Sequence, residues 1–113
     1  MRAISFMLTQ PQIKARTKDV TRRDGWRNAE PGERLRGVEK AMGLKKGEKH
    51  KELAIVEVVS VRRERLDEIT QEEVIREGFP DMTPAGFISM FCDSHRGIVP
   101  SSLITRIEFK YVD

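Results

Sequence analysis

The run Leu53–Val61, LAIVEVVSV, is the feature that most constrains how this chain can fold. β-branched residues dominate it, and Glu57 and Ser60 are its only polar residues. A strand this apolar needs cover on both faces, so we expect it to run through the middle of a sheet. The chain has 113 residues, which is enough for one modest core. We therefore take residues 1–113 as a single domain.

Four further segments predict strands around this central one. The first two are the short apolar run Ala3–Leu8 and the β-branched run Val20–Arg23. The third is Glu33–Glu39, in which Leu35 and Val38 are candidate inward residues, and the last is Ser102–Tyr111, in which apolar and polar residues alternate. We expect the last one to be an antiparallel edge or barrel strand.

Start and stop signals predict short helices over residues 9–15, 70–77 and 84–93. Thr70 and Glu73 form a capping box, and Gly78 is a plausible stop for that helix. Strands and helices in this order predict an α+β fold. Its sheet is small, bent and mostly antiparallel, forming a partly open β-barrel that short helices cap rather than line.

Composition excludes several classes of protein. A single cysteine, Cys92, allows no intramolecular disulfide and no cysteine-rich zinc cluster, which fits a reducing cytoplasm. No window approaches the roughly 18 apolar residues of a membrane span, and the N-terminal apolar run is too short for a signal peptide. The net charge of +3 is too mild for wholesale coating of nucleic acid. We expect a soluble, unprocessed cytoplasmic protein without a membrane partner.

The segment Ile13–Trp26, IKARTKDVTRRDGW, carries five Lys or Arg residues and the only tryptophan. Lys18 and Thr21 lie three residues apart in it, and an amine made less basic by neighbouring cations can activate a hydroxyl. The pair can act together only if the chain bends near Asp19, because this spacing places side chains on opposite faces of a flat strand. The segment indicates a site for an anionic or nucleotide-like ligand; a solvated basic turn is the alternative.

Other reactive residues have simpler interpretations. Cys92 and His95 lie three apart and could meet as thiolate and base, but Cys92 follows Phe91 on an amphipathic helix and is interpreted as a core residue. His50 lies in a lysine-rich run and is interpreted as exposed. The run Met42–Lys51 predicts a mobile loop or hairpin tip on the surface, with a phosphate clamp as the alternative. We expect no metal site.

The order of several short motifs resembles a known family. These motifs are Lys18-Asp19-Val20-Thr21 with Arg23, the turn Pro31–Leu35, the strand Leu53–Val61, the helix start Ile69-Thr70 and the strand Ile104–Tyr111. Together they resemble an ASCH domain of the PUA-like superfamily over nearly the whole chain. The resemblance implies a small β-barrel with flanking helices and a cleft, related to RNA-binding domains.

Within that family, the chain resembles the small bacterial N4-acetylcytidine amidohydrolases. The resemblance implies Lys18 as the base, Thr21 as the nucleophile and Glu77, seven residues beyond Thr70, as the assisting carboxylate. Glu72 and Glu73 are the fallback carboxylates. No metal or organic cofactor is implied.

Three residues are the expected substrate contacts: Arg22, Arg23 and Trp26. The arginines also make Lys18 less basic, and an arginine would stabilise the oxyanion. Trp26 is expected either to stack on the base or to plug the barrel.

Three functions follow from these observations. The first is hydrolysis of the amide of an N4-acylated cytidine or cytosine, with a small-molecule nucleoside as the partner. The second is an RNA-binding module, with or without ribonuclease activity; against it stands the small number of aromatic residues outside apolar blocks. The third is a nucleotide-sensing or partner-binding domain without catalysis.

Overall fold

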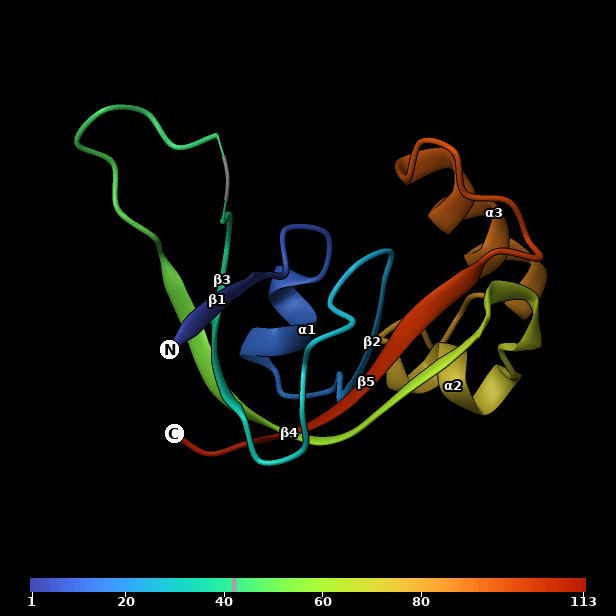
Figure 1. The fold of residues 1–113 in the computed structure, drawn as a ribbon, viewed down its shortest axis with the longest axis horizontal. Helices are drawn as coiled ribbons and strands as arrows, with labels where there is room; N and C mark the ends of the chain where they lie inside the picture. The colour runs from blue at the N-terminus through green and yellow to red at the C-terminus, as the bar shows by residue number, and fades with distance from the viewer. Residues whose placement is uncertain (42) are drawn as a thin grey trace.

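The computed structural model describes residues 1–41 and 43–113, and its centre is a five-stranded sheet in the order β1-β3-β4-β5-β2. The strands are β1 Arg2–Ser5, β2 Val20–Arg23, β3 Arg34–Val38, β4 Glu52–Arg65 and β5 Leu103–Tyr111. β1 runs parallel to β3, and the other neighbours are antiparallel. The sheet curls into a half-barrel (Figure 1), which confirms the predicted α+β fold with a bent, mostly antiparallel sheet.

β4 is the central strand, as the apolar run predicts. It is longer than predicted, with 14 residues, and it pairs with β3 on one side and β5 on the other. The pairing with β5 shifts register between Val58 and Ser60, and such a bulge bends a strand. β5 is antiparallel, as expected, and because β2 covers its other side, it is the barrel strand of the two predicted alternatives and not an edge strand.

The helices of the described residues are α1 Gln10–Lys14, the 3-10 helix η1 Leu66–Glu68, α2 Gln71–Arg76 and α3 Pro84–Ser94. Thr70 caps α2, as predicted, by accepting a hydrogen bond from the Glu73 N–H at 3.2 Å, and Thr83 caps α3 by accepting one from the Gly86 N–H at 3.0 Å. The strand expected over Ala3–Leu8 ends earlier, at Ser5, and α1 follows closely. None of the described helices has the length and apolar character needed to cross a membrane.

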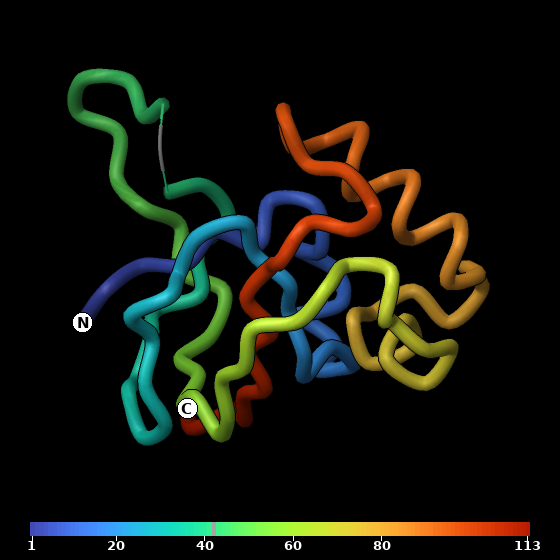
Figure 2. Tube along the Cα trace, turned by 45° about the vertical axis from the view of Figure 1, so that its right-hand side comes forward, coloured from blue at the N-terminus to red at the C-terminus, as the bar shows by residue number. Residues whose placement is uncertain are grey.

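Two apolar cores form on the sheet. The first lies in its hollow and includes Ile4, Ile13, Leu35, Val56 and Phe109. Because α1 supplies Ile13 to this core, α1 fills the curl of the sheet (Figures 1 and 2), which corrects the expectation that every helix only caps the barrel. The second core joins α2 and α3 to the sheet and includes Leu66, Val74, Phe87, Phe91 and Ile104.

Residues 43–51, which precede β4, project away from the sheet (Figures 1 and 2). Residues 43–51 form neither helix nor strand, and Lys45, Lys46, Lys49 and Lys51 are exposed. The prediction of a surface loop is confirmed for these residues, while Met42, which begins the predicted loop, lies outside the described residues.

Charged side chains fill the space between α2 and the sheet. The carboxylate of Glu73 accepts hydrogen bonds from Arg106 of β5 and Arg22 of β2. Burial alone would raise the pKa of this carboxyl, but the hydrogen bonds from Arg106 and Arg22 outweigh burial and lower its pKa to about 2. Only one half of the predicted capping box therefore forms. The Glu73 N–H donates to the Thr70 side chain, but the Glu73 carboxylate accepts from the two arginines.

Gly78 ends α2 in a conformation that favours glycine, with φ +102°, and a Cβ there would lie 2.8 Å from Cγ of Gln12. We expect Gly78→Ala to lower the free energy of unfolding by more than about 2 kcal/mol, because left-handed strain of roughly 1–2 kcal/mol adds to this clash. Gly97→Ala is the control, since Gly97 has φ +84° and open space. Urea denaturation would contradict the prediction if both variants lost the same stability.

The ionisation of Glu73 should make the free energy of unfolding depend on pH. Because its pKa is lowered from 4.5 to about 2, its contribution is complete above about pH 4.5 and is lost as the pH falls towards 2. We expect Glu73→Gln to cost roughly 3 kcal/mol at pH 7, with the deficit shrinking across that window. Urea melts at several pH values measure it, with exposed Glu72→Gln as the control. A deficit independent of pH would refute this linkage.

Candidate functional site

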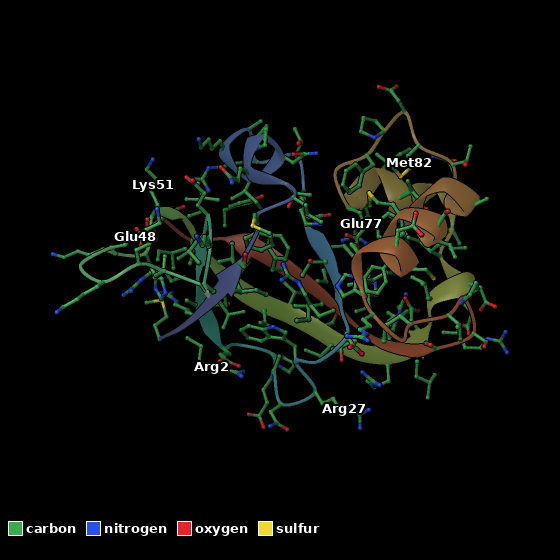
Figure 3. The ribbon with its side chains drawn as sticks, turned by 90° about the horizontal axis from the view of Figure 1, so that it is seen from above. Arg2, Arg27, Glu48, Lys51, Glu77 and Met82 are labelled. Atoms are coloured by element: carbon green, nitrogen blue, oxygen red, sulfur yellow. The ribbon has the colours of Figure 1, made fainter. Side chains whose placement is uncertain are left out.

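A cavity of about 250 Å³ opens between the β1–α1 turn, β2, the end of α2 and α3. This volume lies just below the range of roughly 300–1,000 Å³ typical of small-molecule sites. The charged residues that line it are Lys18, Arg22, Arg23 and Glu77, and Thr21 adds a hydroxyl. In Figure 3, Glu77 lies between β2 and α3.

Lys18 enters the cavity because the chain is held in place around it. The Asp19 N–H donates to the carbonyl oxygen of Arg76 on α2, while the Tyr111 hydroxyl donates to the carbonyl oxygen of Lys18. Lys18 precedes β2 and Thr21 is its second residue, so the two side chains escape the alternation of a continuous strand. Both line the same cavity, and both are buried, at 2% and 3% exposure.

The side chain of Lys18 is bound by Glu77. Its Nζ donates to Glu77 Oε1 at 2.7 Å and to the Glu77 carbonyl oxygen at 2.8 Å. Glu77 is the C-cap of α2 and is buried as deeply as Lys18, at 2% exposure. Burial lowers the pKa of Lys18; Glu77 opposes this shift, and the charges of Arg23 and Arg22 add to it. The amine is therefore easier to deprotonate than an ordinary lysine.

Arg23 donates a hydrogen bond to the hydroxyl of Thr21. Its Nε donates to Thr21 Oγ1 at 3.1 Å, and its guanidinium carbon lies 5.1 Å from the centre of the Phe6 ring. Within residues 1–41 and 43–113, no carboxylate lies within ion-pair distance of Arg23. Burial lowers the pKa of Arg23 to about 10. Its guanidinium can thus bind an oxygen that develops negative charge in the cavity.

The hydrogen-bond partners of the Arg22 side chain are carboxylates. Its two terminal nitrogens donate to Glu77 Oε2 at 3.0 Å, Glu64 Oε1 at 2.8 Å and Glu73 Oε1 at 3.1 Å. Its Nε is buried and has no hydrogen-bond partner among the described residues. Arg22 therefore holds Glu77 in position. Of the fallback carboxylates, Glu73 belongs to this cluster and Glu72 is exposed, and neither lines the cavity.

Trp26 lies elsewhere. It packs beside the core in the hollow of the sheet, and the guanidinium of Arg2 lies 4.7 Å from its ring centre. It does not line the cavity, so the expectation that it stacks on a base there is corrected in favour of its packing role. The reason is local: the turn after β2 gives Trp26 a positive φ of 62°, and its ring packs against the apolar core.

One wall of the cavity is aromatic, which the sequence analysis missed. Phe79, Phe87, Phe91 and His95 all line it, with successive ring centres 6.0, 6.2 and 3.9 Å apart. The scarcity of aromatic residues had counted against base stacking, yet the fold gathers these rings at one site. The signal was present in the spacing of Phe87, Phe91 and His95, because residues four apart lie on one helix face.

The remaining reactive residues, Cys92 and His50, do not line the cavity. Cys92 is half-buried and packs against the second core, and it does not line the cavity. His50 is exposed and lies beside the carbonyl oxygen of Ala41. The described residues contain no cluster of three or more side chains of His, Cys, Asp or Glu that could hold a metal ion.

The solved structures that share this architecture include two with low sequence identity to this chain. A protein of the DUF984 family from Enterococcus faecalis V583 aligns with a TM-score of 0.62 over 94% of this chain and 68% of its own, at 14% identity. An ASCH domain from Lactobacillus crispatus JV V101 aligns with a TM-score of 0.60 over 97% of this chain and 79% of its own, at 16% identity. No model of a known family and no curated protein sequence matches the chain. Its curled sheet and helices therefore show the fold of an ASCH domain, a PUA-like α+β fold.

Proposed function

We propose that this cavity hydrolyses the amide of an N4-acylated cytidine, releasing a carboxylic acid and cytidine. The observation that supports this proposal is that Lys18, Thr21 and Glu77 line one cavity. Lys18 and Glu77 are 59 residues apart, yet they form a buried hydrogen-bonded pair. These are also the three residues to which the resemblance to the amidohydrolases assigns the catalytic roles.

In the first step, the Thr21 hydroxyl oxygen attacks the acyl carbonyl carbon and its proton passes to neutral Lys18. The lowered pKa of Lys18 makes the neutral amine accessible, and the Arg23 hydrogen bond favours negative charge on Thr21 Oγ1. Arg23 then binds the carbonyl oxygen as it becomes an oxyanion.

In the second step, the bond from the acyl carbon to N4 breaks. Lys18, now protonated, passes one of its hydrogen-bonded protons along the 2.7 Å contact to Glu77, which donates it to the departing exocyclic amine. Water then attacks the ester on Thr21, with Lys18 accepting its proton and returning one to Thr21 Oγ1 as the carboxylic acid leaves. Every proton is accounted for by groups that line the cavity.

The aromatic wall supports a planar ring as the ligand. Rings of Phe87 and Phe91 line the side contributed by α3, Arg22 and Arg23 lie on β2, and Lys18 precedes that strand. A pyrimidine presents an apolar face and a polar edge, which suits such a divided site.

Substitutions at the proposed reacting groups test this mechanism, with N4-acetylcytidine as substrate and released cytidine as the measured product. We expect Lys18→Ala and Thr21→Ala each to lower kcat at least about a hundredfold, because members of one catalytic unit fail together. Thr21→Ser should retain more activity, since it keeps the hydroxyl.

The control for this series is Lys14→Ala, which removes an exposed lysine of α1. Wild-type turnover in Thr21→Ala would exclude a threonine nucleophile. Absence of any hydrolysis by the wild-type protein would refute the proposed activity as a whole.

RNA binding is the second candidate, because ASCH and PUA-like folds can bind RNA and the loop 43–51 presents exposed lysines. Figure 3 places Glu48 and Lys51 at the end of the molecule opposite α2 and α3, with Glu77 near those helices. The loop and the cavity are thus separate surfaces, and their functions can be tested separately.

Salt distinguishes the two candidates. A neutral nucleoside releases no counterions, so we expect kcat/KM for N4-acetylcytidine to change less than about threefold between about 50 and 200 mM salt. RNA binding should weaken steeply across that range. Lys45→Glu, Lys46→Glu and Lys49→Glu combined should weaken RNA binding and leave nucleoside turnover unchanged. Tight, salt-sensitive RNA binding without nucleoside hydrolysis would favour the second candidate.

A further inference from the structure

His95 ends α3 beside the cavity, and its ring is fixed in orientation. The ring lies parallel to that of Phe91, with centres 3.9 Å apart and an angle of 9° between planes. Its Nδ1 lies 2.9 Å from the carbonyl oxygen of Phe91 and 3.1 Å from Oγ of Ser94. His95 and Ser94 both line the cavity, where the proposed mechanism gives them no role.

These contacts define which nitrogen of His95 carries a hydrogen. A carbonyl oxygen can only accept, so Nδ1 must be the donor in its contact with Phe91. In the neutral ring, Nε2 is then a hydrogen-bond acceptor. Nε2 forms no hydrogen bond with any of the described residues, so it is available to a ligand.

The depth of the cavity determines which part of a ligand meets His95. Lys18, Thr21 and Glu77 are at most 3% exposed and form its floor. The turn residues Met7 and Leu8, which also line it, are 57% and 62% exposed and lie at its mouth, and Ser94 is exposed as well. In an N4-acylated cytidine, the amide at C4 and the sugar at N1 lie on opposite sides of the ring. An amide at the floor therefore places the sugar at the mouth.

We infer that His95 recognises the sugar of a nucleoside, its Nε2 accepting a hydrogen bond from a sugar hydroxyl. This inference rests on the proposed function. It makes His95 the residue that distinguishes a nucleoside from the corresponding free base, and it assigns the end of α3 to substrate selection.

Binding of the reaction products tests His95 without requiring catalysis. Calorimetric or NMR titrations would compare cytidine with cytosine on the wild-type protein, His95→Asn and His95→Gln. Asparagine can keep a donor near the Nδ1 position and removes the acceptor at Nε2, whereas glutamine can place an amide oxygen near Nε2. His50→Asn, at the exposed histidine of the loop, is the matched control.

We expect wild-type protein to bind cytidine roughly three- to tenfold more tightly than cytosine, as one hydrogen bond allows. His95→Asn should lose this preference without weaker cytosine binding, His95→Gln should recover part of it, and His50→Asn should keep it. The same ratio should appear in kcat/KM for N4-acetylcytidine against N4-acetylcytosine.

Three results would overturn the inference: no binding of cytidine by the wild-type protein, equal loss of both ligands in His95→Asn, or an unchanged preference in that variant. Equal loss would mean that His95 only caps α3. A preference for cytidine that depends on His95, in a protein that hydrolyses no N4-acylated substrate, would support sugar recognition and refute the proposed catalysis.

Discussion

The buried ion pair between Lys18 and Glu77 links the start of β2 to the end of α2, and the arrangement of the cavity depends on it. Both groups have lost their water, and a charge left without its partner in such a place costs about 3–5 kcal/mol. An apolar pair of similar volume would give comparable stability without that risk. The pair therefore adds little net stability, and its clear structural effect is to hold Lys18 and Glu77 together at the cavity.

The charged groups around this pair differ in their partners. Glu64 and Glu73 take up the terminal nitrogens of Arg22, and Arg22 in turn fixes Glu77. Arg23, the next residue along β2, faces Thr21 and has no carboxylate within ion-pair distance among the described residues. The two arginines are adjacent on β2 and both line the cavity, yet they have different partners: three carboxylates for Arg22 and the Thr21 hydroxyl for Arg23.

Local patterns in the sequence predict much of the fold. The composition of Leu53–Val61 places β4 at the centre of the sheet, and Thr70 and Thr83 each begin a helix through one side-chain hydrogen bond. Local patterns do not predict contacts between segments that are distant in the sequence. Glu73 has the right spacing for a capping box, yet arginines from β2 and β5 outcompete it. The aromatic wall is likewise a product of packing, because Phe79 joins the rings of α3 only in the folded chain.

The two hydrogen bonds from Lys18 to Glu77 also have a consequence for the proposed mechanism. A carbonyl oxygen and an ionised carboxylate oxygen both only accept, so each takes a hydrogen from Lys18 Nζ. A neutral amine has two hydrogens, and both are then directed to Glu77. Its lone pair must occupy the remaining position, away from Glu77 and available to the cavity that Thr21 also lines. Glu77 would in this way orient the base as well as carry its proton, and an aspartate, whose shorter side chain separates carbonyl from carboxylate differently, would disturb that orientation even with its charge retained.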